Sequence, residues 1–237
     1  MPHADASLVP DSIKTKSEFW THVYDQLEIL VGVQRHWVSN LSNAASLIYS
    51  SLQAFPSNFG DGERSVNWCG ESSVFHCRSR QPGQQTLAKE DRPAPFFVMT
   101  CFYLISSLFP QPRFTDDASM DPKSQTHAST NMLLGPFSGR PACQWIEVSP
   151  RPRGVCGDAF VKRSTVLVPD VLTYPGHIAC DGDTKSEIVC PLILRKGGED
   201  IVLGVLDLDC LAIGGFDADD QVGLERIAAL IIRSCDW

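Results

Sequence analysis

The sequence predicts an α+β fold in which N-terminal helices and a returning C-terminal helix pack on a central antiparallel sheet. Three observations support this fold class. Apolar residues recur at three- and four-residue steps from Ser17 to about Phe55, short apolar runs separated by Gly, Pro and Asp follow from Asn131, and an amphipathic segment lies near the end of the chain. Helices, then strands, then a helix are typical of an α+β sandwich.

The N-terminal pattern divides into two helices. Ser17 is a residue type favoured at helix N-caps, so the first helix is expected to begin there. A polar break at Gln34–His36 separates it from a second helix, which Pro56 stops. Residues 1–16 are interpreted as a tail and residues 17–237 as one domain.

The strands are expected in the middle and later parts of the chain. They are "CFYLISSLF" (101–109), "MLLGPF" (132–137), "CQWIEV" (143–148), "STVLVPDV" (164–171), "EIVCPLIL" (187–194) and "IVLGVLDLDC" (201–210). "GVCGDAFVKR" (154–163) predicts a short helix opened by glycines, and Asp217–Arg233 predicts an amphipathic helix with an acidic first turn. Residues 110–130 are polar and turn-rich, so a loop is expected there.

Composition limits the classes of partner. The chain has 237 residues, a net charge of −8 and 43% hydrophobic residues, which suits one globular domain with a real core. The acidic balance argues against nucleic acid or an anionic membrane as a partner. No apolar run is long enough to span a membrane, and the first residues lack the pattern of a secretory signal. A cytoplasmic location is therefore expected.

The nine cysteines include no C-x-x-C pair, so a structural metal site is not expected. Cys190 and Cys210 lie in apolar strand contexts and are interpreted as small core residues. The remaining cysteines are expected to include a redox-active subset.

Five strings carry a resemblance to a known family: "LGPFSGRPAC" (134–143), "RGVCGDAF" (153–160), "YPGHIACDGDTKSEIVCPL" (174–192), "GVLDLDC" (204–210) and "GGFDADDQVGLERIA" (214–228). Together they resemble the free methionine-(R)-sulfoxide reductases, which are GAF-domain enzymes. The similarity is nearly continuous from Leu133 onward and is looser in the N-terminal helices and at "VNWCG". It implies a single GAF domain that reduces free methionine (R)-sulfoxide to methionine.

The resemblance also implies the cofactors, the partners and the active cysteines. Family members bind no metal or flavin, are recycled by thioredoxin with thioredoxin reductase and NADPH, and are often homodimers. Their three active cysteines correspond to Cys143, Cys156 and Cys180. The family pattern makes Cys180 the attacking thiol and Cys143 and Cys156 its resolving partners, although either Cys156 or Cys180 can be drawn as the attacker.

Carboxylates near these cysteines suit the chemistry. A thiol that takes oxygen from a sulfoxide becomes a sulfenic acid, and the oxygen needs a proton as it leaves. Asp207 and Asp209 are separated by one residue, so on a strand they share a face, and close acids tend to retain a proton. Together with Glu187 they match the acidic residues of the family. His177 is assigned no role.

The sequence departs from the family at one place. The family's "NW-x-G-F-Y-L" strand is split here, because "VNWCG" ends at Gly70 and "FYL" resumes at Phe102. The intervening residues 71–101 are either a genuine insertion or an intervening sequence retained in the coding region. Trp68 and Tyr103 would line the substrate pocket. They come together only if the chain leaves the sheet after Gly70 and returns to it at Phe102. An inactive reductase and a GAF-type small-molecule sensor are the alternative functions.

Overall fold

The computed structural model of the chain describes residues 9–59, 99–109, 131–178 and 180–237. Its helices are α1 (Lys16–Val31), α2 (Trp37–Gln53), α3 (Pro56–Phe59), α4 (Gly154–Lys162) and α5 (Ala218–Ser234), with short 3₁₀ turns at Ser106–Leu108 and Val171–Thr173. Its strands are β1 (Met99–Ile105), β2 (Asn131–Ser138), β3 (Trp145–Glu147), β4 (Val166–Val168), β5 (Ser186–Lys196) and β6 (Glu199–Cys210).

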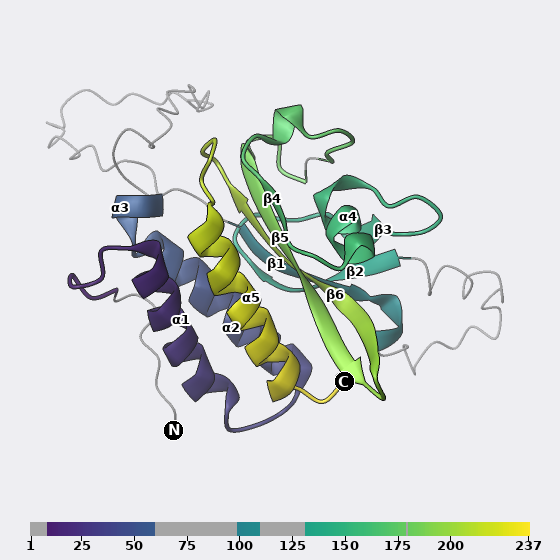
Figure 1. Cartoon of the computed structure of the whole chain (residues 1–237), viewed down its shortest axis with the longest axis horizontal. Helices are drawn as coiled ribbons and strands as arrows, with labels where there is room; N and C mark the ends of the chain where they lie inside the picture. The colour runs from purple at the N-terminus through teal and green to yellow at the C-terminus, as the bar shows by residue number, and fades with distance from the viewer. Residues whose placement is uncertain (1–8, 60–98, 110–130, 179) are drawn as a thin grey trace, which may run out of the picture.

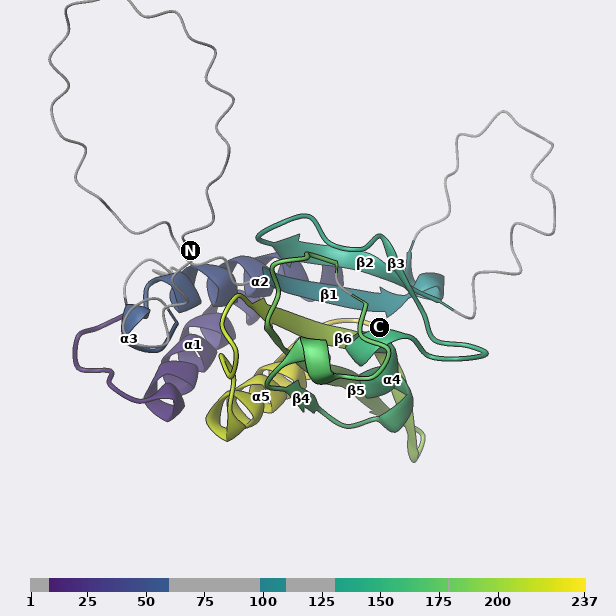
Figure 2. The same ribbon diagram turned by 90° about the horizontal axis from the view of Figure 1, so that it is seen from above.

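The strands form one six-stranded sheet in the order β3-β2-β1-β6-β5-β4, and every neighbouring pair is antiparallel. Helices α2 and α5 pack on one face of the sheet, α1 packs against these two helices, and α4 lies on the other face (Figure 1). The view from above shows the same separation of α4 from the three long helices (Figure 2). The predicted α+β class and the antiparallel sheet are therefore confirmed.

The start of α1 differs from the sequence-based expectation. Thr15, and not Ser17, is the N-cap residue, because its hydroxyl accepts a hydrogen bond from the backbone N–H of Glu18. The Glu18 carboxylate accepts in return from the backbone N–H of Thr15, which completes a capping box. The spacing T-x-x-E therefore outweighs the isolated serine. Pro56 follows the end of α2 and is itself the first residue of α3, a position that proline favours.

Strand β1 also has different bounds. It begins at Met99, so the last three residues of the 71–101 segment are part of the sheet, and it gives way at Ser106 to a 3₁₀ turn instead of continuing to Phe109. Met99, Thr100 and Cys101 pair in sequence with Asp209, Leu208 and Asp207 of β6. Residues 60–98, including Trp68, and residues 110–130 lie outside the described part of the chain.

The two faces of the sheet have different cores. Alternate residues of β1 and β6, such as Phe102, Leu104 and Leu206, pack against the three long helices. The intervening residues, such as Cys101, Tyr103 and Val205, point to the opposite side and pack with α4. Functional groups on the α4 side are thus held by strands whose other face is anchored in the larger core.

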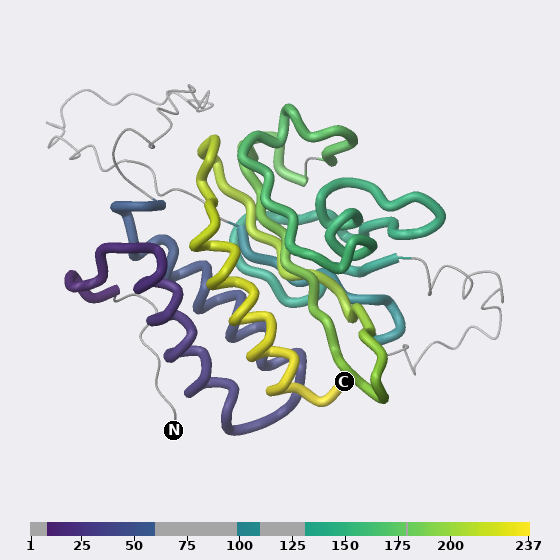
Figure 3. The backbone as a smooth tube through the Cα atoms, in the orientation of Figure 1, coloured from purple at the N-terminus to yellow at the C-terminus, as the bar shows by residue number. Residues whose placement is uncertain are grey.

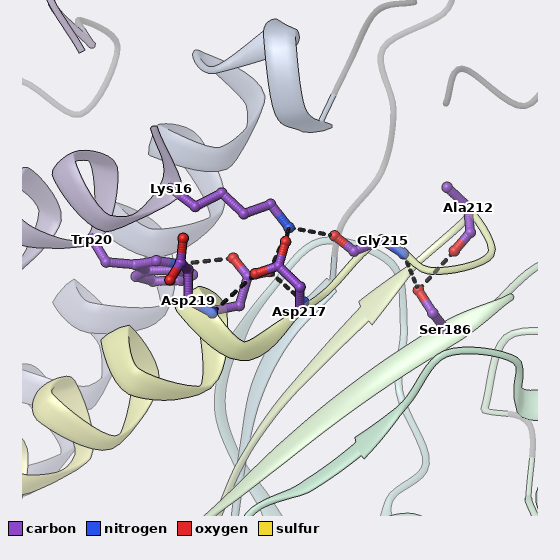
Figure 4. Close-up of polar contacts among 8 residues, drawn as sticks. Lys16, Trp20, Ser186, Ala212, Gly215, Asp217 and Asp219 are labelled. Atoms are coloured by element: carbon purple, nitrogen blue, oxygen red, sulfur yellow. Dashed lines mark hydrogen bonds and ion pairs between the residues drawn. The ribbon is translucent and has the colours of Figure 1, made fainter. Parts of the chain in front are cut away.

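Helices α1 and α5 lie side by side, although they are far apart in the chain (Figure 3). Their close approach depends on Gly223, because a Cβ there would lie 2.1 Å from Cγ of Trp20. A buried ion pair joins the same helices, because Lys16 Nζ lies 2.5 Å from Asp220 Oδ2. Lys16 Nζ also donates to the carbonyl of Gly215 (Figure 4). Trp20 Nε1 donates to the other oxygen of Asp220 at 2.8 Å. This carboxylate is therefore fully partnered.

No helix in the described ranges combines the length and the apolar character that a membrane crossing requires.

Candidate active site

Three carboxylates lie on the α4 face of the sheet because of the register between β5 and β6. Glu187 pairs directly with Asp209, and Asp207 pairs with Val189 two residues further along. The side chains of Glu187, Asp207 and Asp209 share one face, and the residues are only 5%, 3% and 8% exposed. Carboxylates with so little contact with water are costly unless they are neutralised.

Helix α4 brings a thiol to these acids. The chain enters the helix at Gly154, whose φ of 68° is strained for residues with a side chain, and Cys156 follows in the first turn. Cys156 Sγ lies 3.9 Å from Oε1 of Glu187 and also contacts Asp207. The predicted short helix is thus confirmed, and its cysteine lies against the carboxylate cluster.

The other two predicted cysteines form a disulfide. The Sγ atoms of Cys143 and Cys180 are 2.08 Å apart, their Cα atoms are 5.2 Å apart, and both residues are partly exposed. Cys180 also borders the pocket that Cys156 and the three carboxylates line. The hydroxyl oxygen of Tyr103 lies 3.8 Å from Cys180 Sγ. Two of the three cysteines are therefore bonded to each other, while the third is buried with a free thiol.

Arg140 connects the two segments that carry the disulfide. Its Nη1 lies 2.7 Å from Oδ2 of Asp181 and 2.7 Å from Oδ2 of Asp183. Arg140 precedes Cys143 in the chain, and the two aspartates follow Cys180. The acids next to Cys180 in sequence therefore bind a guanidinium, and the acids that approach the thiols come from β5 and β6.

Burial determines the protonation of the cluster. It raises the pKa of Glu187, Asp207 and Asp209 well above their ordinary values, and each carboxyl raises the pKa of another member. Burial also raises the pKa of the Cys156 thiol, and Asp207 adds to that shift. The cluster consequently keeps protons to a higher pH than exposed carboxyls do, and a protonated member can donate its proton.

Two residues reach the site without having been predicted. Cys101 lies 3.4 Å from Oδ2 of Asp207, and His177 Nε2 lies 3.4 Å from Oε2 of Glu187. Burial lowers the pKa of His177, which favours the neutral ring. The two-residue spacing between Cys101 and Tyr103 is a signal that could have identified the cysteine. Nothing in the "PGH" turn indicates a contact with Glu187.

The pocket bordered by Cys156, Cys180 and the acids has a volume of about 10 Å³, roughly the space of one water molecule. A space of that size is too small for a free amino acid. The structure thus places Cys143, Cys156, Cys180, Tyr103 and the three carboxylates in one region. Trp68, the remaining predicted site residue, lies outside the described residues.

Comparison with known proteins gives the family. Over 220 residues the chain is 34% identical to the free methionine-R-sulfoxide reductase of Saccharomyces cerevisiae, covering 93% of this chain and 87% of that protein. The chain belongs to the free methionine-(R)-sulfoxide reductase family. It is also 41% identical over 98 residues to the Escherichia coli protein of the same name, which covers 41% of this chain and 55% of that protein. No family model matches the chain.

Solved structures agree with the fold. A structure titled as that of the GAF domain superposes with a TM-score of 0.64 at 32% identity, covering 97% of this chain and 94% of that one. The free methionine-R-sulfoxide reductase of Neisseria meningitidis, solved in complex with its substrate, superposes with a TM-score of 0.60 at 26% identity, covering 96% and 95%. The predicted single GAF domain is therefore confirmed for this member of the reductase family.

Proposed function

We propose that this chain reduces free L-methionine (R)-S-oxide to L-methionine, with Cys180 as the attacking thiol and Cys143 as the resolving thiol. One observation carries the proposal: Cys180, which is partly exposed and bonded to Cys143, borders a pocket that three buried carboxylates line. A thiol pair supplies the two electrons that a sulfoxide needs, and protonated carboxyls supply the acid.

In the first step the sulfur of Cys180 takes the oxygen of the sulfoxide. The S=O bond of the substrate breaks, the product thioether leaves, and Cys180 becomes a sulfenic acid. A proton from the acidic cluster assists the oxygen as its bond to the substrate weakens. The raised pKa values of Asp207 and Glu187 suit this role because a carboxyl must be protonated to donate.

In the second step Cys143 condenses with the sulfenic acid of Cys180. A disulfide forms and water leaves. Cα atoms 5.2 Å apart lie within the range that disulfides require, so the pair can close without moving the backbone. Cys156 is a weaker candidate for resolving the sulfenic acid, because its thiol is buried and its pKa is raised.

An external dithiol then restores the two thiols by exchange. Both residues of the disulfide are partly exposed, which gives a reductant access to it. We propose thioredoxin, itself recycled by thioredoxin reductase and NADPH, as this reductant. The cytoplasm, where thioredoxin is maintained in its reduced form, is the matching compartment. A cycle of this kind needs no bound metal or flavin.

The same acids explain a preference for a free amino acid. An ionised carboxylate in the cluster can bind the substrate ammonium, which a methionine inside a peptide chain lacks. Because the pocket holds only about 10 Å³ with the disulfide closed, we propose that reduction of the Cys143–Cys180 bond opens it for the substrate.

The test is NADPH oxidation coupled through thioredoxin and thioredoxin reductase. We expect turnover with free methionine (R)-sulfoxide and little or none with the S epimer or with a peptide-bound sulfoxide. Lack of turnover with the free R form would contradict the proposal. Equal rates with the peptide would contradict the role of the ammonium. Turnover with dithiothreitol but not with thioredoxin would reject only the proposed reductant.

A further inference from the structure

We propose that the buried side chains of Cys156, Glu187 and Asp207 form a binding site for a thiophilic divalent cation, with Zn²⁺ as the best fit, and that occupancy inhibits the enzyme. The ion would be a reversible inhibitor and not a resident cofactor. The three residues come from α4, β5 and β6, and all are buried.

The donor atoms are close enough to share one ion. One donor atom from each residue, a thiol sulfur and two carboxylate oxygens, lies within 4.8 Å of the others. Tetrahedral zinc with bonds of about 2.0 to 2.3 Å separates its ligand atoms by roughly 3.5 Å. Cys156 Sγ and Glu187 Oε1 are already 3.9 Å apart. Rotations within the side chains would therefore be enough to close the site.

The second oxygen of each carboxylate is already engaged. His177 lies beside Oε2 of Glu187, while Oε1 faces Cys156. Cys101 donates to Oδ2 of Asp207, and Oδ1 of that residue is buried with no hydrogen-bond partner among the described residues. Metal-binding carboxylates typically have their other oxygen held in this way. An unpartnered buried oxygen would gain a partner from the ion.

The chemistry of the donors selects the ion. Magnesium and calcium prefer sets made of oxygen atoms and water, whereas a thiolate beside two carboxylates suits zinc or another borderline or soft cation. The pocket at this point has the volume of about one water molecule, which suits a single ion. An ion there would occupy the carboxyls that the proposed reaction requires for proton donation, so the inhibition rests on the proposed function.

The direct test titrates Co²⁺, a spectroscopic substitute for Zn²⁺, into the full chain with its Cys143–Cys180 disulfide intact. In that state Cys143 and Cys180 have no free thiol that could bind the metal. We expect a cobalt–thiolate charge-transfer absorption that Zn²⁺ abolishes by displacement. Absence of this absorption from the wild-type protein would overturn the proposal.

Variants locate the ion. Cys156→Ser should abolish the charge-transfer absorption, and Asp207→Asn, which replaces a carboxylate ligand with a neutral amide, should weaken affinity at least about 10-fold. Cys190→Ser, which removes a buried thiol on the opposite face of the sheet, should leave affinity unchanged. The double variant Cys143→Ser/Cys180→Ser should also bind. Absorption that persists in Cys156→Ser, affinity that Asp207→Asn leaves unchanged, or loss of binding in the double variant would each overturn the site.

The inhibition is then measured in the coupled assay. Zn²⁺ should reduce turnover, and a chelator should restore it. Binding of Co²⁺ needs no turnover, so its failure would leave the proposed reductase activity untouched. An inactive chain that still binds Co²⁺ through Cys156 would instead contradict only the proposed function.

Discussion

Asp220 and Asp207 are both buried, yet the protein treats them in opposite ways. Asp220, on the face covered by α1, α2 and α5, contacts Lys16, the indole of Trp20 and the backbone N–H of Asp217. Asp207, on the α4 face, contacts the thiols of Cys101 and Cys156, and its Oδ1 has no hydrogen-bond partner within the described residues. The first carboxylate joins two helices, whereas the second remains available for chemistry.

The comparison distinguishes a buried carboxylate that supports the fold, Asp220, from one that serves the site, Asp207. A buried carboxylate with a cation and two N–H donors has part of its desolvation cost offset by local partners, although burial still raises the pKa of Asp220. A carboxylate among other acids retains that cost and keeps its proton. The ion pair of Asp220 therefore supports the fold, whereas the carboxylate cluster on the α4 face reduces stability in exchange for reactive groups.

Replacement of the attacking thiol should give the largest effect on the reactive face. Cys180→Ser is expected to lower turnover by more than about 1,000-fold, because the other free thiols at the site, Cys156 and Cys101, are buried and have raised pKa values. The coupled NADPH assay measures it. Cys190→Ser, on the other face, is the matched control and should retain activity. Full activity in Cys180→Ser would remove this residue from the attacking role.

Removal of the cation on the structural face should have the largest effect on stability. Lys16→Met leaves Asp220 buried beside Trp20 without its cation, which should lower the free energy of unfolding by about 3–5 kcal/mol. Urea denaturation followed by tryptophan fluorescence measures this change. Turnover per folded molecule should stay close to that of the wild type. A loss of turnover without a loss of stability would show that the two faces are not separate.

Asp207→Asn should lower turnover and raise the free energy of unfolding. Without the carboxyl proton, turnover is expected to fall by about 100-fold. Since an amide carries no buried charge, the free energy of unfolding near pH 8 should rise, by about 1.4 kcal/mol for each unit by which folding raises the pKa. If the variant lost stability as well as turnover, Asp207 would mainly support the fold.

The same cluster sets the dependence of stability on pH. When folding raises the pKa of a carboxyl, the folded state holds the proton over a range where the unfolded chain has lost it. Wild-type stability should therefore decrease as the pH rises from about 4 towards the raised pKa values of the cluster. Asp207→Asn should make the decrease shallower. Thermal unfolding between pH 4 and pH 9 tests this, and identical profiles would contradict it.

The smallest effect is expected at Arg140. Its ion pairs with Asp181 and Asp183 are partly exposed, so Arg140→Ala should cost less than about 1 kcal/mol of stability. The segment that carries Cys180 should become less well positioned, and kcat/KM should fall a few-fold. Arg195→Ala, which breaks the exposed pair with Asp200, is the control and should change neither property. If Arg140→Ala lost more stability than Lys16→Met, the expected order of these effects would be wrong.

The elements that the sequence predicts best are those in which one pattern dominates. The helical period of α1, α2 and α5 and the apolar runs of β5 and β6 indicate their type directly. The grouping of Asp207 with Asp209 follows from strand alternation alone. The contact between Glu187 and Cys156 depends on how α4 packs across the sheet, which local sequence does not encode. The resemblance to the family predicts that Glu187 and Cys156 belong to one site, whereas their spacing in the sequence does not.

Cys101 and His177 show where prediction from sequence stops. Cys101 belongs to the interrupted part of the family pattern, so no motif indicates it. Its two-residue spacing from Tyr103 predicts that it shares a face with that residue, but its position opposite Asp207 depends on the register of β1 with β6. His177 reaches Glu187 through a loop whose path follows from tertiary contacts. The same limit applied at the start of α1, where a reciprocal hydrogen-bond pattern at Thr15 outweighed a single favourable residue at Ser17.

The Cys143–Cys180 bond encloses the whole of α4, because 37 residues of sequence separate its ends. By chain entropy, closing a loop of that length restricts the unfolded chain enough to favour the folded state by about 4 kcal/mol. The oxidised protein, which must wait for a reductant, is consequently more resistant to proteolysis and heat than the reduced protein that is ready to react. In a cell short of reducing power, the resting pool would accumulate in its longer-lived form, and the return of reductant would restore both reactivity and fragility.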